Sequence, residues 1–445
     1  ASDVYKRQIK DIPHKLKGKY PKFIEIRGEI FMKKSHFEQL NKIQIENNNK
    51  IFANSRNAAA GSIRQKDVNI LKQRKLNFLA FTIGEYTEDF NFDNQVHLLR
   101  RFDEMGLITN KENYLANNIK EIKEFYIKIL SKRHILDYEI DGLVYKVNNK
   151  ILQERLGNLS RAPRWAIAHK LPAEVVETTL LNIETQVGRT GALTPVGKLE
   201  PIRVGGVLVS NVSLHNEDEI FRKDIRIGDT IKIQRAGDVI PQVLGVVKEK
   251  RVKDLSVYSA PKHCPSCNGI TFKPDGEAVR RCLSGINCPA QTVEKLKHFV
   301  SKNAFNIDGL GEKLIEMLFK EGIIKDFADI FAIEKYKNRL EKKVGLGKLS
   351  VSNLLDSIES KKKITFDKLI YALGIRQVGE TNSKLLALHY NSFENFRIEM
   401  TKARDKTSNS FYELVSIDQI GESIAEDLVL YFNTNSNLII FDKLL

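Results

Sequence analysis

Several features that would place a chain in a membrane or outside the cell are missing from these 445 residues. No run of about 18 or more apolar residues occurs, so the sequence predicts no membrane span. The first 15 residues are polar and lack the apolar core of a signal peptide. Cysteine is scarce, and all four cysteines fall within 25 positions. These absences favour a cytoplasmic protein in a reducing environment.

The composition is that of a folded protein with several domains. Hydrophobic residues make up 42% of the chain and charged residues 29%, which favours globular structure over disorder. The length allows three or four domains, each with its own core. We therefore expect a multidomain α+β protein. Its four parts are a mixed module at 1–175, an OB-fold β-barrel at 176–258, a four-cysteine module at 259–292 and a helical domain at 293–445.

The net charge of +15 is concentrated in the first part of the chain. Residues 1–175 carry 32 lysines and arginines against 21 acidic residues, whereas residues 293–445 are nearly neutral. Such a surplus favours a polyanionic partner, because lysine-rich surfaces attract phosphates without reading sequence. Taken alone, the surplus is also compatible with a role in solubility.

Local patterns predict the order of helices and strands. In the first part, helical spacing of apolar residues occurs at 34–47, 97–105 and 119–131, and strand patterns occur at 76–84 and 140–147. From about residue 177 to 250 the pattern changes to short strands with glycine turns, for example at 207–209 and 230–234. Several short strands at this spacing predict a small barrel of the OB-fold type.

Three short stretches carry charges that packing does not explain. They are Glu25–Glu29, Glu139–Lys146 and Trp165–Lys170, and the last two are apolar strand patterns that each end in a lysine. Burying an unpaired lysine is costly, so these side chains are either solvent-exposed strand ends or parts of a site. A pocket that gathers lysines, arginines and carboxylates suits a nucleotide phosphate and a divalent metal.

In this order, the three stretches resemble motifs III, IV and V of the covalent nucleotidyltransferases, most closely those of the bacterial NAD-dependent DNA ligases. The resemblance continues through essentially the whole chain. Further stretches similar to signatures of that family lie at 186–195, 214–216 and 235–241.

The resemblance implies a set of active-site residues. Glu29 is expected to contact the ribose or a metal, and Asp141 to associate with a metal. Phe81 falls where the family places an aromatic residue that stacks on adenine, although ordinary core packing would also explain it. The lysines expected to neutralise the AMP phosphate are Lys146 and Lys170, and the active-site arginines are Arg56, Arg64 and Arg133.

Three positions depart from the family pattern. Ser55 replaces a common proline, His169 a common aromatic residue and Leu171 a common phenylalanine. We expect the first change to loosen a turn and the other two to alter the packing beside Lys170.

The nucleophile of that family is the lysine of a Lys-x-Asp-Gly motif upstream of the Arg-Gly-Glu stretch. No such motif precedes Glu25, and the one literal match, Lys273–Gly276, lies between two cysteine pairs where Pro-Asp-Gly predicts a turn. The chain also starts at Ala1 without a methionine. We therefore expect a fragment without the nucleophile segment, the N-terminal NAD-recognition domain and the C-terminal BRCT domain of the family.

The four cysteines, Cys264, Cys267, Cys282 and Cys288, form two close pairs joined by a short loop. This spacing fits one tetrahedral zinc site with four thiolates. Two disulfides are the competing interpretation, and the cytoplasmic character of the chain favours zinc. A site with four thiolates has no open coordination position, so we expect a structural Zn²⁺ ion.

The last 150 or so residues contain a weak repeat that resembles helix-hairpin-helix elements. Short segments ending in glycine each precede a predicted helix, at 307–311, 343–347, 375–379 and 417–421. Free amides at such a helix N-terminus can hold a DNA phosphate. The glycines expected to contact duplex DNA, without sequence preference, are Gly309, Gly311, Gly345, Gly347, Gly379 and Gly421.

Together these features predict a DNA ligase that uses NAD and Mg²⁺ (or Mn²⁺) to seal nicks in duplex DNA. We expect a monomeric, cytoplasmic and nucleoid-associated bacterial protein without a membrane partner. Two alternatives remain: a non-catalytic DNA clamp, and an ATP-dependent ligase or RNA-capping relative. The lysine motifs argue against the clamp, and the zinc module and hairpins argue against the ATP-dependent type.

Overall fold

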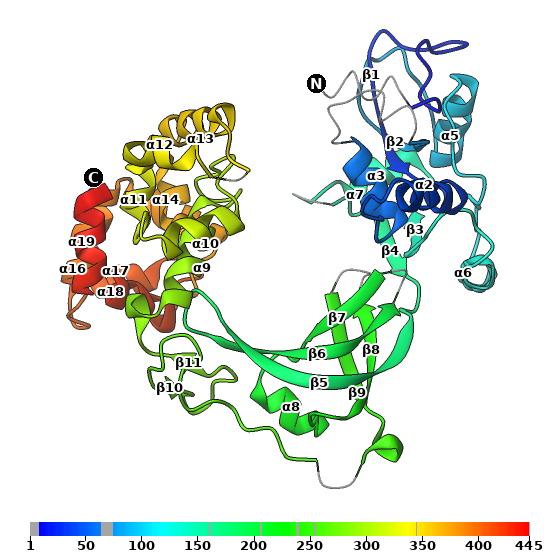
Figure 1. Ribbon diagram of the computed structural model, residues 1–445. Helices are drawn as coiled ribbons and strands as arrows, with labels where there is room; N and C mark the ends of the chain where they lie inside the picture. The colour runs from blue at the N-terminus through cyan, green and yellow to red at the C-terminus, as the bar shows by residue number, and fades with distance from the viewer. Residues whose placement is uncertain are drawn as a thin grey trace. The chain divides into compact units, whose positions relative to one another are not determined.

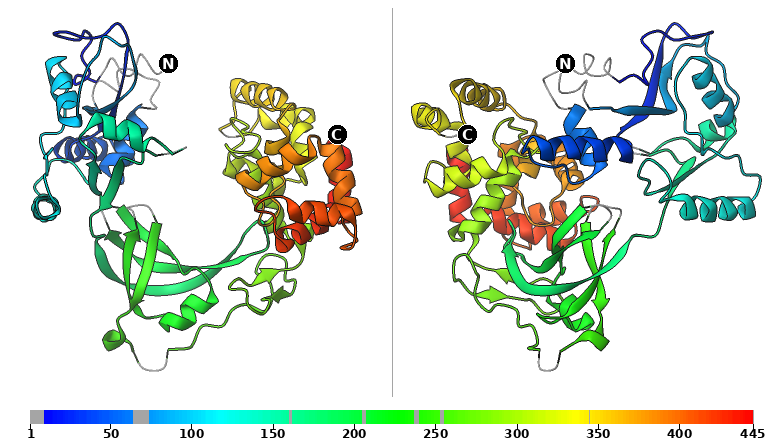
Figure 2. Two further views of the ribbon diagram at one scale, coloured as in Figure 1. Left: turned by 180° about the vertical axis from the view of Figure 1, so that it is seen from behind. Right: turned by 45° about the vertical axis from the view of Figure 1, so that its right-hand side comes forward.

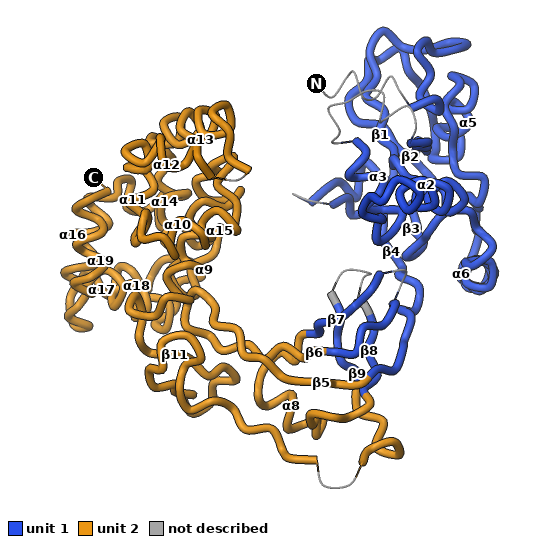
Figure 3. Tube along the Cα trace, viewed as in Figure 1, with its two compact units in different colours: residues 1–178, 199–212, 231–244 blue, residues 179–198, 213–230, 245–445 orange. Residues whose placement is uncertain are grey.

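The computed structural model describes residues 9–63, 74–159, 162–204, 207–236, 240–252, 255–343 and 345–444 (Figure 1). The chain divides into two compact units, which Figure 3 shows in blue and orange. The first unit consists of residues 1–178, 199–212 and 231–244, and the second of 179–198, 213–230 and 245–445. Within the described residues, no helix has both the length and the apolar character needed to cross a membrane.

The first part of the chain contains two antiparallel strand pairs and the helices around them. β1 (Ile24–Phe31) pairs with β2 (Asn77–Tyr86), and β3 (Gly142–Lys146) pairs with β4 (Ala166–Lys170). The helices are α2 (Lys34–Glu46), α3 (Ser55–Ile63), α5 (Gln95–Glu104), α6 (Ile119–Lys132) and α7 (Lys150–Leu156). The helices and strands predicted here from the sequence are confirmed, with ends that differ by a few residues.

Alternation along β2 separates a buried face from an exposed one. Phe78 and Ala80 are buried in the core of this part, with Phe90 and Phe102, whereas Phe81 points to the other face. α5 and α6 begin at asparagines whose side chains accept hydrogen bonds from first-turn amides, as is typical of N-caps. The core therefore supports the sheet from one side and leaves its other face open.

The second part is a closed five-stranded barrel, as the OB-fold prediction requires. Its strands follow the order β5-β6-β7-β9-β8 around the barrel. The elements are β5 (Val175–Val187), β6 (Leu193–Val204), β7 (Val207–Ser213), α8 (Glu217–Lys223), β8 (Thr230–Ala236), β9 (Ile240–Val246) and the 3-10 turn η1 (Lys248–Lys250).

The cysteine module has little regular structure, and the residues after it are almost entirely helical (Figure 2, yellow to red). The module contains β10 (Thr271–Phe272), β11 (Arg281–Cys282) and η2 (Gly285–Asn287). The helical elements are α9 (Pro289–Val300), α10 (Glu312–Lys320), α11 (Phe327–Phe331), η3 (Ile333–Tyr336), α12 (Lys337–Leu340), α13 (Lys348–Ser360), α14 (Phe366–Ala372), α15 (Glu380–Tyr390), α16 (Phe393–Lys402), α17 (Asn409–Ser416), α18 (Glu422–Phe432) and α19 (Asn435–Leu444).

One continuous apolar core runs through these helices. It includes stacked rings, such as Phe299 on Phe327 with centroids 4.5 Å apart, and Phe396 against Phe432 at 4.9 Å. The helices before and after each of the four predicted hairpins share this core. The hairpins are therefore held on a common scaffold.

Candidate active site and metal centre

The β3–β4 ribbon places two of the expected lysines on one face. Lys170 lies directly opposite Gly142, and Lys146 follows Gly142 by four residues on the same strand. Because side chains alternate along a strand and paired residues share a face, Lys146 and Lys170 project from the same face, with Cα atoms about 14 Å apart. Between them this face carries Val144 and Ala168, which pair with each other. The result is a small apolar surface, which we call the apolar floor, with a lysine ammonium at each end.

Lys146 reaches from β3 to β2. Its Nζ donates a hydrogen bond of 3.0 Å to the carbonyl of Phe81 and lies 5.3 Å from the centre of the Phe81 ring. Burial lowers the pKa of Lys146, because desolvation disfavours the charged form. Among the described residues no carboxylate forms an ion pair with it. An anionic ligand would therefore supply the missing counter-charge.

Phe81 occupies a β-bulge. Arg27 pairs with Thr82 and Gly28 pairs with Ala80, so Phe81 is the extra residue between the two pairs. Bulges redirect side chains and are common beside active sites. The Phe81 side chain is 42% exposed, so the alternative of ordinary core packing is wrong. Gly28 is required here, because a Cβ atom would lie 2.2 Å from the Phe78 ring.

The other residues expected in this site lie on neighbouring elements. Glu29 is exposed on β1, opposite Leu79 and on the same face of the sheet as Phe81. Arg56 is exposed in the first turn of α3, which packs against β1. Arg64 lies outside the described residues. The structure thus brings Glu29, Phe81 and Lys146 to one face, with Arg56 on the adjoining helix.

Lys170 and Asp141 form an ion pair at the other end of the ribbon. The Asp141 carbonyl also accepts from the Leu171 amide at 2.8 Å, which holds the strand end in place. Arg133, just after α6, donates from Nη1 to the Pro172 carbonyl at 3.1 Å. Arg133 thus fixes the backbone two residues beyond Lys170.

On the opposite face of the ribbon, one side chain contacts α6. The His169 ring stacks on Tyr126, with centroids 4.2 Å apart and an interplanar angle of 11°. Its Nδ1 lies 2.7 Å from the Tyr145 hydroxyl. His169 thus forms an aromatic stack on the strand that ends in Lys170, and the effect of this departure from the family pattern stays a prediction. Leu171 is buried, and so is Ser55 in the first turn of α3.

Lys273, in the one literal Lys-x-Asp-Gly match, is held as a charged structural group. Its Nζ contacts Asp218 at 2.5 Å and Glu217 at 3.3 Å, and these carboxylates raise the pKa of Lys273. A nucleophilic lysine requires the opposite shift. The Glu277 amide donates to the Pro274 carbonyl at 3.1 Å, which confirms the predicted turn.

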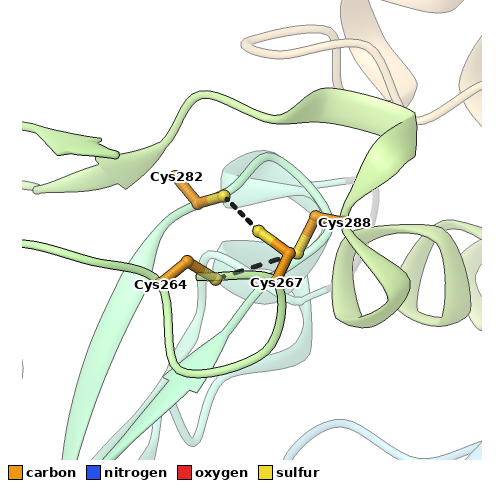
Figure 4. A group of neighbouring side chains, drawn as sticks. All are labelled: Cys264, Cys267, Cys282 and Cys288. Carbon is orange, nitrogen blue, oxygen red and sulfur yellow. Dashed lines mark hydrogen bonds between the residues drawn. The ribbon is translucent and has the colours of Figure 1, made fainter. Parts of the chain in front are cut away.

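The four cysteines converge as a single cluster (Figure 4). Their sulfur atoms all lie within 4.8 Å of one another, at 3.8 Å between Cys264 and Cys288 and 3.5 Å between Cys267 and Cys282. Four thiolates at about 2.3 Å from a tetrahedral zinc ion would be about 3.8 Å apart. A disulfide requires about 2.05 Å. The distances fit a zinc site and exclude disulfides in this structure.

The pKa values of the thiols differ across the cluster. The Ser284 hydroxyl beside Cys267 lowers the pKa of that thiol to about 6, whereas burial raises the pKa of Cys264 to about 12. Like charges this close together disfavour the thiolate form, and a bound cation would offset that cost. Bound Zn²⁺ deprotonates coordinating thiols. The donor set and its spacing thus fit a structural zinc ion.

The four hairpins share one backbone geometry. In each, a residue with positive φ precedes the N-cap glycine by two positions, and an apolar residue between them packs on the helical core. The positive-φ residues are Gly309 (86°), Gly345 (86°), Gln377 (61°) and Gln419 (65°), and the N-cap glycines are Gly311, Gly347, Gly379 and Gly421. All four predicted helix starts are confirmed.

The helices that follow the hairpins begin without a side-chain cap. At each N-cap glycine a Cβ atom would meet nothing within 4 Å, so the space beside each of these four glycines is open. Elsewhere in the same domain, α11, α16 and α17 are capped by Asp326, Ser392 and Ser408. The uncapped ends leave N–H groups free for an anion.

One residue that contacts this site has no signal in the sequence. Gln95, at the start of α5, is buried and donates from Nε2 to the Phe81 carbonyl at 3.3 Å, the same oxygen that accepts from Lys146. Gln153 in turn donates to Gln95 Oε1 at 3.3 Å. A glutamine at a helix start is unremarkable in sequence, so only the fold reveals this contact.

Comparison with known protein families agrees with this architecture. The model of the NAD-dependent DNA ligase adenylation domain matches residues 3–174, and that of the NAD-dependent DNA ligase OB-fold domain matches 177–255. The NAD-dependent DNA ligase C4 zinc finger domain matches 263–290, and a helix-hairpin-helix motif matches 368–440. These matches define the class of the chain as one with a ligase adenylation domain followed by an OB-fold barrel.

Curated proteins similar in sequence to this chain show which family within this class it belongs to. A DNA ligase of Afipia carboxidovorans is 46% identical over 450 residues, with 99% of this chain and 64% of the relative covered. DNA ligases of Rhodopseudomonas palustris (47% over 460 residues; 99% and 64% covered) and Rickettsia bellii (44% over 437; 97% and 63%) are similar. The chain belongs to the NAD-dependent DNA ligase family, and it spans a little under two thirds of the length of these relatives.

Proposed function

We propose that this protein seals 5′-phosphate/3′-hydroxyl nicks in duplex DNA, through enzyme-AMP and DNA-adenylate intermediates with NAD as AMP donor. The observation that carries the proposal is the β3–β4 ribbon. It presents Lys146 and Lys170 on one face, at the two ends of an apolar floor. The nearby Phe81 ring, exposed at a bulge, suits a stacked adenine.

The remaining side chains complete a site for a nucleotide and its phosphate. In this proposal, Glu29 contacts the ribose or a metal ion, and Asp141 orients Lys170 and associates with a metal. Arg56, Arg64 and Arg133 are the active-site arginines, whose planar guanidinium groups suit bidentate phosphate binding. The placement of Glu29 on β1, Arg56 on α3 and Lys170 on β4 supports the assignment.

The last step illustrates what the residues do. The 3′-hydroxyl oxygen at the nick attacks the 5′-phosphorus of the adenylylated strand, and AMP leaves with the electrons of the broken P–O bond. The hydroxyl proton goes to water. Negative charge grows on the phosphate oxygens, and the ammonium groups of the partly desolvated Lys146 and of Lys170 stabilise it. Mg²⁺ or Mn²⁺ would add Lewis-acid stabilisation of the same phosphates.

The other parts serve DNA binding and structure. We propose that Cys264, Cys267, Cys282 and Cys288 hold a structural zinc ion. The uncapped amides after Gly309–Gly311, Gly345–Gly347, Gly379 and Gly421 hold backbone phosphates of the duplex without sequence preference. A domain division at 1–175, 176–258, 259–292 and 293–445 belongs to this proposal, as does action as a monomer at the bacterial nucleoid. The ranges of the family matches support the division.

A non-catalytic DNA clamp is the second candidate. The four uncapped hairpin helices would serve a clamp equally well. A clamp, however, has no use for a desolvated Lys146 beside an exposed aromatic ring.

A sealing assay with two nicked duplexes and Mg²⁺ tests the proposal. One duplex carries a 5′-phosphate and is supplied with NAD, and the other is already adenylylated at the nick. Because these 445 residues contain no Lys-x-Asp-Gly motif before Glu25, we expect them to seal only the second duplex. Binding without sealing of either duplex would favour the clamp. An AMP adduct on the chain after incubation with NAD would show that another lysine is the nucleophile.

A further inference from the structure

Glu277 of the cysteine module connects two arginines from different parts of the second unit. Its Oε1 accepts from Arg376 Nη2 at 2.8 Å, and its Oε2 lies 3.6 Å from Arg281 Nε. The two guanidinium groups lower the pKa of Glu277, Arg376 first, so this carboxylate stays charged at neutral pH. The pairs are partly buried, with 32% of the Glu277 side chain exposed.

Arg376 and its neighbour Gln377 lie within the third hairpin and bind the helix of the fourth. Gln377 Nε2 donates to Asp427 Oδ2 at 2.7 Å and to Ser423 Oγ at 2.8 Å, and Arg376 Nε lies 3.7 Å from Asp427. Ser423 and Asp427 are in the first turns of α18, just after Gly421. The third and fourth hairpins are thus joined side chain to side chain.

On its other side the network reaches the barrel. Arg281 Nη1 donates to Thr190 Oγ1 at 3.1 Å, in the turn between β5 and β6. The Cys282 amide also donates to the Gly191 carbonyl at 2.8 Å, so a backbone hydrogen bond joins the same two segments. A continuous chain of polar contacts therefore runs from the barrel turn through the cysteine module to both hairpins.

Gln377 adopts a conformation that is unfavourable for its residue type. Its φ is 61°, in the left-handed region, where the first two hairpins have glycine. Non-glycine residues in this region cost about 1 kcal/mol or more. The hydrogen bonds of the Gln377 side chain with α18 offset part of this cost.

We propose that Gln377 and Glu277 are positioning residues. They make the third and fourth hairpins a single unit that binds the DNA backbone at two points. The Gln377 side chain fixes the distance between the two uncapped helix ends, and Glu277 fixes the pair relative to the cysteine module and the barrel turn. This inference rests on the proposed binding of duplex DNA. Its consequence is that the two hairpins bind neighbouring phosphates as one unit, and that uncoupling the hairpins costs one of the two contacts.

Gln377→Gly separates this role from folding, because glycine suits the left-handed backbone. We expect it to keep or raise the melting temperature while increasing the Kd for a short fluorescent nicked duplex about 5- to 20-fold. The slope of log Kd against log salt concentration should fall by about 1, as one phosphate contact is lost. Gln419→Gly is the matched control, since Gln419 has the same backbone but its side chain contacts only Asp418, at 3.2 Å, among the described residues. It should leave Kd unchanged.

Glu277→Gln provides a second, independent test. This substitution should also raise the Kd for the nicked duplex. The double variant Glu277→Gln/Gln377→Gly should have a Kd no higher than that of the single variant that binds more weakly, because both substitutions break the same connected network. Multiplicative losses in the double variant, an unchanged Kd for Gln377→Gly, or an equal loss for Gln419→Gly would overturn the inference. Failure of the wild-type chain to bind the duplex would overturn the DNA-binding proposal itself.

Discussion

Lys146 Nζ donates a hydrogen bond of 3.0 Å to the carbonyl of Phe81, whose ring centre lies 5.3 Å from the same ammonium. This contact joins β3 to the bulge of β2. The Lys146 ammonium has no carboxylate partner among the described residues. The contact places it beside the Phe81 ring, which is exposed to solvent. Such a pair suits a nucleotide, because the ring can stack on the base while the ammonium faces the phosphate.

Removing the Lys146 ammonium should abolish most of the catalysis. We expect Lys146→Met to slow sealing of a pre-adenylylated nick by about 10²- to 10³-fold, as for loss of one donor to a transition-state oxyanion. Duplex binding should change little. Lys150→Met is the matched control, because Lys150 lies 4.6 Å from the Phe92 ring centre outside the proposed site. Equal effects of the two substitutions would argue against the assignment.

The rate should also depend on the charge of Lys146 at alkaline pH. Burial lowers the pKa of Lys146, so it loses its proton at a lower pH than an ordinary lysine. The neutral amine cannot stabilise phosphate charge, and single-turnover sealing should therefore fall as the pH rises through this pKa. Lys146→Arg should extend activity to higher pH at a reduced maximum, because arginine stays charged. If the sealing rate of wild type and of Lys146→Arg fell over the same alkaline pH range, a group other than Lys146 would be responsible for the loss.

Phe81 should contribute through stacking. Phe81→Leu keeps apolar bulk at the bulge but removes the flat ring, and we expect about a 5- to 100-fold higher KM for the adenylylated nick. Phe81→Tyr should behave almost as wild type, because the ring remains. The melting temperature should be unchanged in both, since 42% of the side chain is exposed. If the loss appeared in kcat alone, stacking on adenine would not be its cause.

Zinc removal should destabilise the cysteine module and its neighbours. The four sulfurs lie within 4.8 Å, so a strong chelator or Cys282→Ser should lower the melting temperature and release about one zinc per chain. A reductant alone should have no effect, because the structure contains no disulfide among these cysteines. Stabilisation that disappears with reductant and survives chelation would support disulfides instead.

The hairpin glycines should separate into two classes. Gly309 has φ of +86°, so Gly309→Ala should cost about 1–2 kcal/mol of unfolding free energy. Gly379 is extended, with open space around its Cβ position, and Gly379→Ala should leave stability unchanged. The added methyl group would still crowd the free amides, so the Kd for duplex DNA should rise. Equal destabilisation of the two variants, measured by denaturant unfolding, would contradict the geometry.

Local interactions explain why much of the fold was predictable. The four hairpin helices begin after glycines that the sequence shows directly, and α2, α5, α6, β2 and β3 follow from apolar periodicity over a few residues. The cysteine cluster was predictable because its ligand spacing is compact in the chain. The Pro-Asp-Gly turn after Lys273 is equally local.

The site was only partly predictable, because its contacts join residues far apart. The bulge at Phe81 depends on the pairing of β1 with β2, and the carbonyl it offers to Lys146 and Gln95 exists only in the folded sheet. Whether Phe81 is core or exposed also depended on which face of β2 meets the core. The roles of the individual site residues stay predictions until the variants are measured.

The sequence by itself determined the order of domains, the resemblance to the ligase family, the helix starts and the zinc ligands, since each depends on residue types at short spacing. Tertiary structure alone decided which side chains meet. It placed Lys146 and Lys170 on one face, and it joined Glu277 to Arg376, 99 residues later, through a contact that no local pattern encodes. Such contacts arise from the packing of whole elements, and so they appear only once the chain has folded.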